Sequence, residues 1–381
     1  MTVAPLNALR RSLFLISAPM VFIMFALPLR AEDLGASAIE IGALYAVFTV
    51  SLFVVRPLVG IGLDLIGRRP FFLLALALYF AANFLYALSG NYEALFGARL
   101  LQGIAFSILT ITTDTITADV SEAADRSRAM GANIASQSRG GMAGAFIGFS
   151  LVGAFPAFAW QYSFFIYSIV AVLAVYIAFK IIPETRPVIS GDERAEKFRF
   201  PPQQYMLLVV IFLAAAAVAS IQPYYLIYLR ERFDLPLNAL AFAFLPVGIA
   251  YAVLPGWLGK VTGRLPRAAA MATGLLMTAA IYLFVPHIDR FLMIMAAFTF
   301  SAVGAVLAEL TRNAWVADIA GPGAAGRTFG VAALVAGAGA ALGPLAGGAV
   351  YEHVSRDGLF YVAAATLIAA AILLTLQPKR G

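Results

Sequence analysis

The chain is a series of long apolar runs separated by short polar segments, and this alternation leaves few folds open to it. A helix needs about 20 apolar residues to cross the hydrocarbon core of a bilayer. Only 12% of the residues are charged and 62% are hydrophobic, whereas a soluble domain carries roughly 25% charged residues. We therefore predict an all-α integral membrane protein with twelve transmembrane helices. They are expected near residues 12–30, 41–63, 70–89, 94–117, 129–154, 160–182, 204–228, 237–258, 267–286, 290–316, 327–350 and 358–377.

The longest polar interruption, Glu184–Arg199, divides these runs six and six. It predicts an N-terminal six-helix bundle over residues 1–183, a linker over 184–203 and a C-terminal six-helix bundle over 204–381. With the N-terminus inside, seventeen of the 26 Lys and Arg residues fall in cytoplasmic segments and five fall outside. Positive residues collect on the cytoplasmic side of membrane proteins. We therefore expect a multi-pass protein of the cell (inner or plasma) membrane, with both termini cytoplasmic.

Three patterns recur almost 200 residues further along the chain. Such internal repeats are typical of transporters that bind their substrate where two homologous halves meet. The pairs are Gly60-x3-Asp64-x2-Gly67-Arg68 with Gly256-x3-Lys260-x2-Gly263-Arg264, Ala118-Asp119-Val120 with Ala317-Asp318-Ile319, and the stripe Gly140, Gly144, Gly148 with Gly339, Gly343, Pro344, Gly347, Gly348. We expect two pseudo-symmetric halves, in which the glycine stripes are helix-packing surfaces.

The densest polar stretch of the first half is Arg56–Arg69. If it continues as a helix, Arg56, Gly60 and Asp64 share one face, and Arg68 lies one turn beyond. This spacing predicts a charged latch at the membrane edge. The alternative is a solvated basic loop that only sets the topology.

These motifs resemble those of the major facilitator superfamily, and the resemblance covers essentially the whole chain. Gly60–Arg69 is similar to the family's loop motif between helices two and three, Arg99-x2-Gln102-Gly103 to its fourth-helix motif, and Gly339–Gly348 to the glycine-proline motif of drug/proton antiporters. The antiporter motif normally lies in helix five, where Ala145 and Phe149 interrupt it here. Leu65 stands where the loop motif usually has a basic residue, and Lys260 replaces the acid in the second copy.

The resemblance implies the fold of that family, with two bundles that rock around a central site. It also implies a conformational latch that ties the cytoplasmic ends of helices two, four and eleven in the outward-facing state. The resemblance assigns its charge cluster to Asp64, Arg68 and Asp119. The residues expected in the latch as a whole are Arg56, Gly60, Asp64, Gly67, Arg68, Arg69 and Asp119.

Charged residues inside apolar runs are candidates for function, because a charge at the bilayer centre costs at least about 2.5–3.5 kcal/mol. Glu309 and Arg312 are three apart and are expected either to form a structural ion pair or to let Glu309 carry a proton. Arg139 needs an acceptor, which could be an acid of the protein or an anionic substrate. The candidates for substrate or proton binding are Glu309, Arg312, Asp114, Arg139, Arg99, Gln102, Thr110, Thr113, Gln137, Tyr224 and Tyr225. The two tyrosines could instead be interfacial anchors.

The chain has no cysteine and only two distant histidines, His287 and His353, so we expect no metal site. Its sequence shows no catalytic triad and no phosphate-binding loop, so we expect no cofactor and no enzymatic activity. The expected function is export of a small organic molecule by alternating access, driven by a proton gradient. Uptake or exchange of an organic anion is the alternative, and a sensor that transports nothing is a second. The expected partners are the small-molecule substrate, protons and the lipid bilayer, but no nucleic acid, and the chain is expected to be a monomer.

Overall fold

The computed structural model describes residues 3–121, 126–185, 205–235, 265–319 and 325–375, together with the single positions 246, 250, 254 and 258. Within these residues all regular structure is helical. The chain divides into two compact units: unit 1 is Met1–Ala36 with Val47–Glu193, and unit 2 is Ser37–Ala46 with Arg194–Gly381. The predicted helix 237–258, apart from those four single positions, and the predicted linker beyond Thr185 lie outside the described residues.

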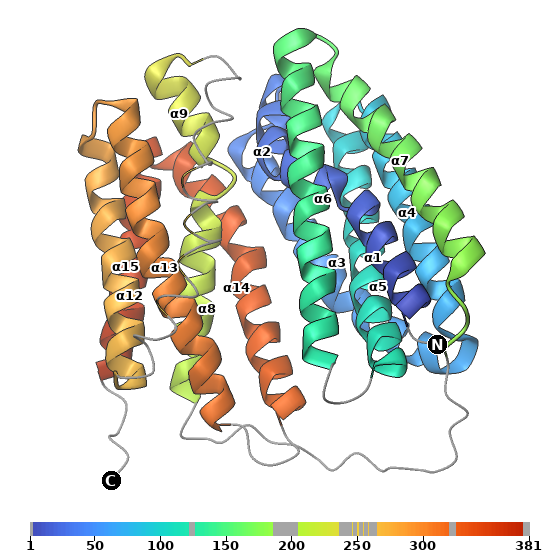
Figure 1. The fold of residues 1–381 in the computed structure, drawn as a ribbon. Coiled ribbons are helices and arrows are strands. Elements are labelled where there is room, and N and C mark those ends of the chain that lie inside the picture. The colour runs from blue at the N-terminus through green and yellow to red at the C-terminus, as the bar shows by residue number, and fades with distance from the viewer. Residues whose placement is uncertain are drawn as a thin grey trace. The chain divides into compact units, whose positions relative to one another are not determined.

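Unit 1 is a bundle in which α1, α4, α5 and α7 surround a common apolar core (Figure 1). Buried members of this core include Leu13, Tyr79, Ile108 and Ala174, one from each of the four helices. Val59 and Leu63 of α3 also belong to it. The described helices are α1 (Val3–Ile16), α2 (Ala18–Asp33), α3 (Ala38–Ile66, whose first turns group with unit 2), α4 (Arg68–Leu88), α5 (Tyr92–Val120), α6 (Arg126–Ala154) and α7 (Ala159–Ile181).

In unit 2, α8 packs against α14 and α15, and α12 packs against α13 and α15 (Figure 1). The described elements are α8 (Tyr205–Ile221), α9 (Tyr225–Phe233), α12 (Arg267–Phe284), the 3₁₀ turn η3 (Val285–His287), α13 (Phe291–Ile319), α14 (Ala325–His353) and α15 (Arg356–Thr375).

Among the described residues, ten helical spans are long and apolar enough to cross a membrane. The chain is therefore an all-helical membrane protein, as its apolar runs predict. The predicted span 129–154 is present as the 29-residue helix α6, but α6 is not among those ten. Its composition explains this, because Asn133, Ser136, Gln137 and Arg139 interrupt the apolar sequence.

Two predicted spans are interrupted in the structure. The first consists of α1 and α2, which meet at Ser17, and the seventh consists of α8 and α9, which meet at residues 222–224. A proline lies at each break: Pro19 is in the first turn of α2, and Pro223 is within residues 222–224. Because proline has no backbone N–H, it cannot donate the hydrogen bond that would continue the preceding helix.

The glycine stripe of α6 lets that helix touch the backbone of α1 and α2. A Cβ atom on Gly140 would lie 1.9 Å from the carbonyl oxygen of Phe14, and one on Gly144 would lie 1.9 Å from the carbonyl oxygen of Ala18. Small residues allow such close approach of helices in a membrane. The stripe is therefore a packing surface.

The corresponding stripe of α14 makes the same kind of contact with α8. A Cβ atom on Gly339 would lie 2.4 Å from the carbonyl oxygen of Phe212, and one on Gly343 would lie 2.3 Å from that of Ala216. The glycines recur 199 residues apart, and Phe14 and Ala18 recur as Phe212 and Ala216 after 198. The repeat seen in the sequence thus corresponds to one helix contact made in each unit.

Candidate functional site

Unit 2 contains a cavity of about 380 Å³ bounded by α8, α12, α13, α14 and α15. Most of its lining is small or aliphatic, because alanines and Gly337 face it from α8, α13 and α14. The polar lining consists of Gln222, Thr278, Glu309 and Arg312. Thr278 uses its hydroxyl within the protein, donating to the carbonyl oxygens of Gly274 or Ser301 at 3.1 and 3.3 Å. Glu309 and Arg312 therefore provide the charge of the cavity.

Glu309 and Arg312 form an ion pair along one face of α13. Nη2 of Arg312 lies 3.3 Å from Oε1 of Glu309. The same guanidinium donates to Oδ1 of Asn313, from Nε at 3.2 Å and from Nη2 at 3.1 Å. The side chain of Glu309 is 52% exposed and that of Arg312 is 28% exposed. The carboxylate is thus the more accessible charge, and it accepts a single bond from the guanidinium.

The candidates Arg99 and Gln102 lie together inside unit 1. Nη1 of Arg99 donates to Oε1 of Gln102 at 2.8 Å, and the Tyr86 hydroxyl donates to the same oxygen at 3.1 Å. The guanidinium carbon of Arg99 also lies 4.3 Å from the centre of the Phe48 ring, a cation–π contact. Trp160 donates its indole N–H to the carbonyl oxygen of Tyr86 at 2.7 Å. These contacts connect α3, α4, α5 and α7 around a buried cation.

The remaining polar candidates of unit 1 are dispersed over α5 and α6. Asp114 is exposed and has Arg56 as its charged neighbour. Arg139 is exposed and makes no hydrogen bond or ion pair within the described part of the chain. Thr110 and Thr113 lie on α5: the first donates to the Phe106 carbonyl oxygen at 3.0 Å, and the second is buried. Gln137 is half-buried on α6.

The latch residues are centred on Arg68, at the start of α4. Arg68 is 5% exposed, and its Nε lies 3.0 Å from Oδ2 of Asp119 at the end of α5. Its Nη1 donates to the carbonyl oxygen of Leu63 at 2.8 Å. Arg69 donates to the carbonyl oxygen of Phe179 at 2.8 Å. The predicted pair of Arg68 with Asp119 is therefore present within unit 1, whereas the side chain of Asp64 lies outside the described residues.

Glu184 contacts the residues assigned to the latch, and sequence reasoning missed it. Its carboxylate accepts the backbone N–H of Arg68 at 2.8 Å and that of Arg69 at 3.1 Å, at the N-terminus of α4. An anion is stabilised there by the unpaired N–H groups and the positive end of the helix dipole. Gly67 makes this possible, since its φ is +116° and a Cβ atom would lie 2.5 Å from Oε2 of Glu184. The available signal was an acid directly after the sixth apolar run.

Unit 2 has its own version of this ion pair. Nε of Arg267 lies 2.8 Å from Oδ2 of Asp318, and both residues are 199 positions after Arg68 and Asp119. The sequence pattern had instead matched Arg68 with Arg264, which lies outside the described residues. In the structure Arg68 and Arg267 are each the first residue of a helix, α4 and α12.

Tyr224, expected as a binding or anchor residue, is fully buried and does not line the cavity. Its hydroxyl oxygen lies 2.8 Å from the carbonyl oxygen of Ala38 and 2.7 Å from that of Pro344. A Cβ atom on Gly42 or on Gly348 would lie 2.6 Å from this hydroxyl. Tyr225 is also buried, against Phe298. Tyr224 thus joins the first turns of α3 to α14 inside unit 2.

Replacing Tyr224 by phenylalanine is expected to lower the free energy of unfolding by about 1 kcal/mol, the usual net value of a buried hydrogen bond. The measurement is the melting temperature of the purified protein. Tyr176→Phe serves as the control, because that tyrosine is 60% exposed. Equal melting temperatures for the two variants would contradict the assignment.

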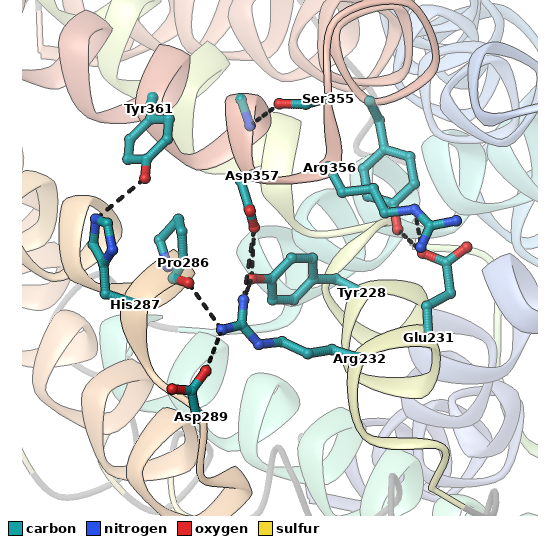
Figure 2. Close-up of polar contacts among 12 residues, drawn as sticks. Tyr228, Glu231, Arg232, Pro286, His287, Asp289, Ser355, Arg356, Asp357 and Tyr361 are labelled. Atoms are coloured by element: carbon teal, nitrogen blue, oxygen red, sulfur yellow. Dashed lines mark hydrogen bonds and ion pairs between the residues drawn. The ribbon is translucent and has the colours of Figure 1, made fainter.

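A network of charges covers one end of unit 2 (Figure 2). Arg232 of α9 donates to the carbonyl oxygen of Pro286 at 2.8 Å and to Asp289 at 3.0 Å, and it also bonds the Tyr228 hydroxyl. That hydroxyl donates to Oδ1 of Asp357 at 2.8 Å. The network joins α9, the segment after η3 and the start of α15. The predicted spans left Arg232, Asp289 and Asp357 in three separate connecting segments, without a signal that would bring them together.

Sequence comparisons relate the chain to transport proteins. A family model described as Major Facilitator Superfamily matches residues 12–335 and 207–381. Multidrug resistance protein 1 of Bacillus subtilis is 22% identical over 98% of this chain and 96% of that protein. The human chromaffin granule amine transporter is 24% identical over 85% of this chain, which spans 62% of that relative. The quinolone resistance protein NorA of Staphylococcus aureus is 25% identical over 32% of this chain and 31% of its own length.

Solved structures share the fold at lower identity. A bacterial homologue of the human lysosomal transporter Spinster, in an inward-facing and occupied conformation, covers 98% of this chain and 94% of its own with a TM-score of 0.77 and 15% identity. The human organic anion transporter MFSD10 covers 97% and 99% with a TM-score of 0.70 and 19% identity. At these identities the likeness concerns the fold alone. The family model, however, matches most of the sequence, and the chain belongs to the Major Facilitator Superfamily, a family of transporters and not of enzymes.

Proposed function

We propose that this secondary transporter exports a small organic molecule in exchange for protons, with the cavity of unit 2 as part of its binding site. The observation that supports this most directly is the position of Glu309. Its carboxylate lines the cavity from a membrane-spanning helix, and its side chain is 52% exposed. An ionisable group within a membrane-spanning segment is a candidate for ion coupling. If substrate and proton compete for one carboxylate, the transporter couples export of the substrate to entry of the proton.

The names of the relatives also support export of a small organic molecule. Two of them are named for drug resistance and one for amine transport. We also propose that the protein lies in the cell (inner or plasma) membrane with both termini in the cytoplasm, because Lys and Arg residues are concentrated in the segments on that side. We further propose that it acts as a monomer.

The test uses purified protein in proteoliposomes with an imposed pH gradient. The substrates are norfloxacin, dopamine and benzoate, chosen to represent the quinolones, amines and organic anions named among the relatives and the structural neighbours. We expect the gradient to drive uptake of at least one of them. Glu309→Gln should remove the pH-driven component while substrate exchange without a gradient continues. Wild-type pH-driven rates in this variant would refute the role of Glu309, and no flux of any substrate would favour a sensor.

A specific observation supports the second candidate function, uptake or exchange of an organic anion. Arg139 is exposed on a helix rich in polar residues and has no acidic partner in the described part of the chain. A guanidinium in this situation is suited to bind a carboxylate. Under this alternative, benzoate exchange should be lost in Arg139→Ala but retained in Glu309→Gln.

A further inference from the structure

The guanidinium of Arg312 makes more hydrogen bonds to Asn313 than to Glu309. It makes two bonds to Oδ1 of Asn313, at 3.2 and 3.1 Å, and a single one of 3.3 Å to Glu309. If the carboxylate bond opens, both bonds to Asn313 remain. Exposed ion pairs contribute little to stability, so opening this one requires little free energy.

The two charges of the cavity differ in what they offer a ligand. The carboxylate of Glu309 has about four lone-pair sites, and within the described residues the guanidinium uses one of them. Arg312 is the less exposed of the two, at 28% against 52%. An anion approaching Arg312 would also meet the charge of Glu309, three residues away on the same face of α13. A cation approaching Glu309 can replace the guanidinium of Arg312, which keeps its bonds to Asn313.

The walls of the cavity indicate the chemical character of the uncharged part of the ligand. They are formed largely by alanines and by aliphatic side chains such as Ile211, Val218, Leu275 and Leu367. Such walls favour an apolar body, because burying apolar surface contributes roughly 25 cal/mol per Å². The lining includes Glu309 and Arg312 but not Asn313.

We propose, building on the proposed function, that the cavity binds organic cations with an apolar body, and that the cationic group replaces Arg312 at Glu309. Asn313 is then a positioning residue: it holds the displaced guanidinium away from the carboxylate and does not touch the ligand. Arg312 acts as an internal counter-ion that keeps Glu309 paired while the cavity is empty.

The test compares two probes of the same shape and opposite charge, tetraphenylphosphonium and tetraphenylborate. Their binding to the purified full-length protein is measured by equilibrium dialysis, without any gradient. We expect the phosphonium to bind and the borate not to compete with it. Glu309→Gln should weaken phosphonium binding at least tenfold. Glu93→Gln, an exposed acid in the first turn of α5 and outside the cavity, should leave it unchanged.

The arginine and the asparagine are tested together. Arg312→Gln removes the competitor and should tighten phosphonium binding about twofold to fivefold, the range expected for an exposed ion pair. Asn313→Ala should weaken binding by a similar factor, because Arg312 then returns to Glu309. In the Arg312→Gln background, Asn313→Ala should have no effect, since the asparagine acts through the arginine. An equal effect in both backgrounds would overturn the positioning role.

The result is independent of the proton-coupled flux. Stronger binding of the borate, or unchanged phosphonium binding in Glu309→Gln, would reject the cation site even if an organic anion is transported in the flux experiment. Phosphonium binding that depends on Glu309 would support the site even if no pH gradient drives transport.

Discussion

Gly144→Ala is expected to lower the free energy of unfolding by about 3 kcal/mol or more, a larger effect than that of most single substitutions. The added methyl group would lie 1.9 Å from the carbonyl oxygen of Ala18 and 2.4 Å from its carbonyl carbon. Both atoms belong to the backbone of α2, so no side-chain rotation relieves the overlap. Either α6 separates from α2 or the start of α2 is displaced.

A matched control for this change lies on the same helix. Gly131 is exposed, and a Cβ atom there meets nothing within 4 Å. Gly131→Ala is therefore expected to be neutral or to stabilise α6 by up to about 1 kcal/mol, because alanine is the better helix former. Melting temperatures of the purified variants decide the question. Equal melting temperatures for the two variants would contradict the close contact of α6 with α2.

The repeat provides a second, independent pair of variants. Gly343 and Gly330 of α14 stand 199 positions after Gly144 and Gly131. A Cβ atom on Gly343 would lie 2.3 Å from the Ala216 carbonyl oxygen, whereas one on Gly330 meets nothing within 4 Å. Gly343→Ala should thus be strongly destabilising and Gly330→Ala should not.

Arg68→Ala is expected to cost about 3–5 kcal/mol, the range for breaking a buried ion pair by removing one partner. Arg68 is 5% exposed and bonds both Asp119 and the Leu63 carbonyl oxygen. Without it, the carboxylate of Asp119 keeps the Thr185 hydroxyl at 3.2 Å among its partners but loses its counter-ion. The measurement is again the melting temperature, together with the yield of folded protein.

Arg267→Ala is the control for Arg68→Ala. Arg267 pairs with Asp318 at the equivalent position of unit 2, but it is 31% exposed and Asp318 is 48% exposed. Water screens such a pair, so its loss should cost no more than about 1 kcal/mol. A loss for Arg267→Ala as large as that for Arg68→Ala would show that burial does not set the strength of these pairs.

Local features of the site could be predicted from the sequence. Glu309 and Arg312 meet because residues three apart face the same side of any α-helix. The glycine stripes were predicted as packing surfaces because a spacing of four residues places them on one face. Arg68 and Asp119 were paired through the family resemblance, since nothing local relates two residues 51 positions apart.

Partners that come from different helices could not be predicted in this way. Glu184 reaches the N-terminus of α4 because α7 packs antiparallel beside it and ends at that level. The position of Asn313 beside the guanidinium depends on side-chain rotamers. The network around Arg232 gathers residues from α9, from η3 and the segment after it, and from the start of α15 (Figure 2).

The membrane-spanning helices, the internal repeat and the sets of residues that share a helix face all follow from the order of the amino acids. They do so because hydrophobicity and the geometry of a helix are local properties. Which faces meet is a property of the folded chain, in which α6 touches α2, Glu184 caps α4, and Arg267 pairs with Asp318. The reason is that side chains far apart in the sequence become neighbours through the packing of whole helices.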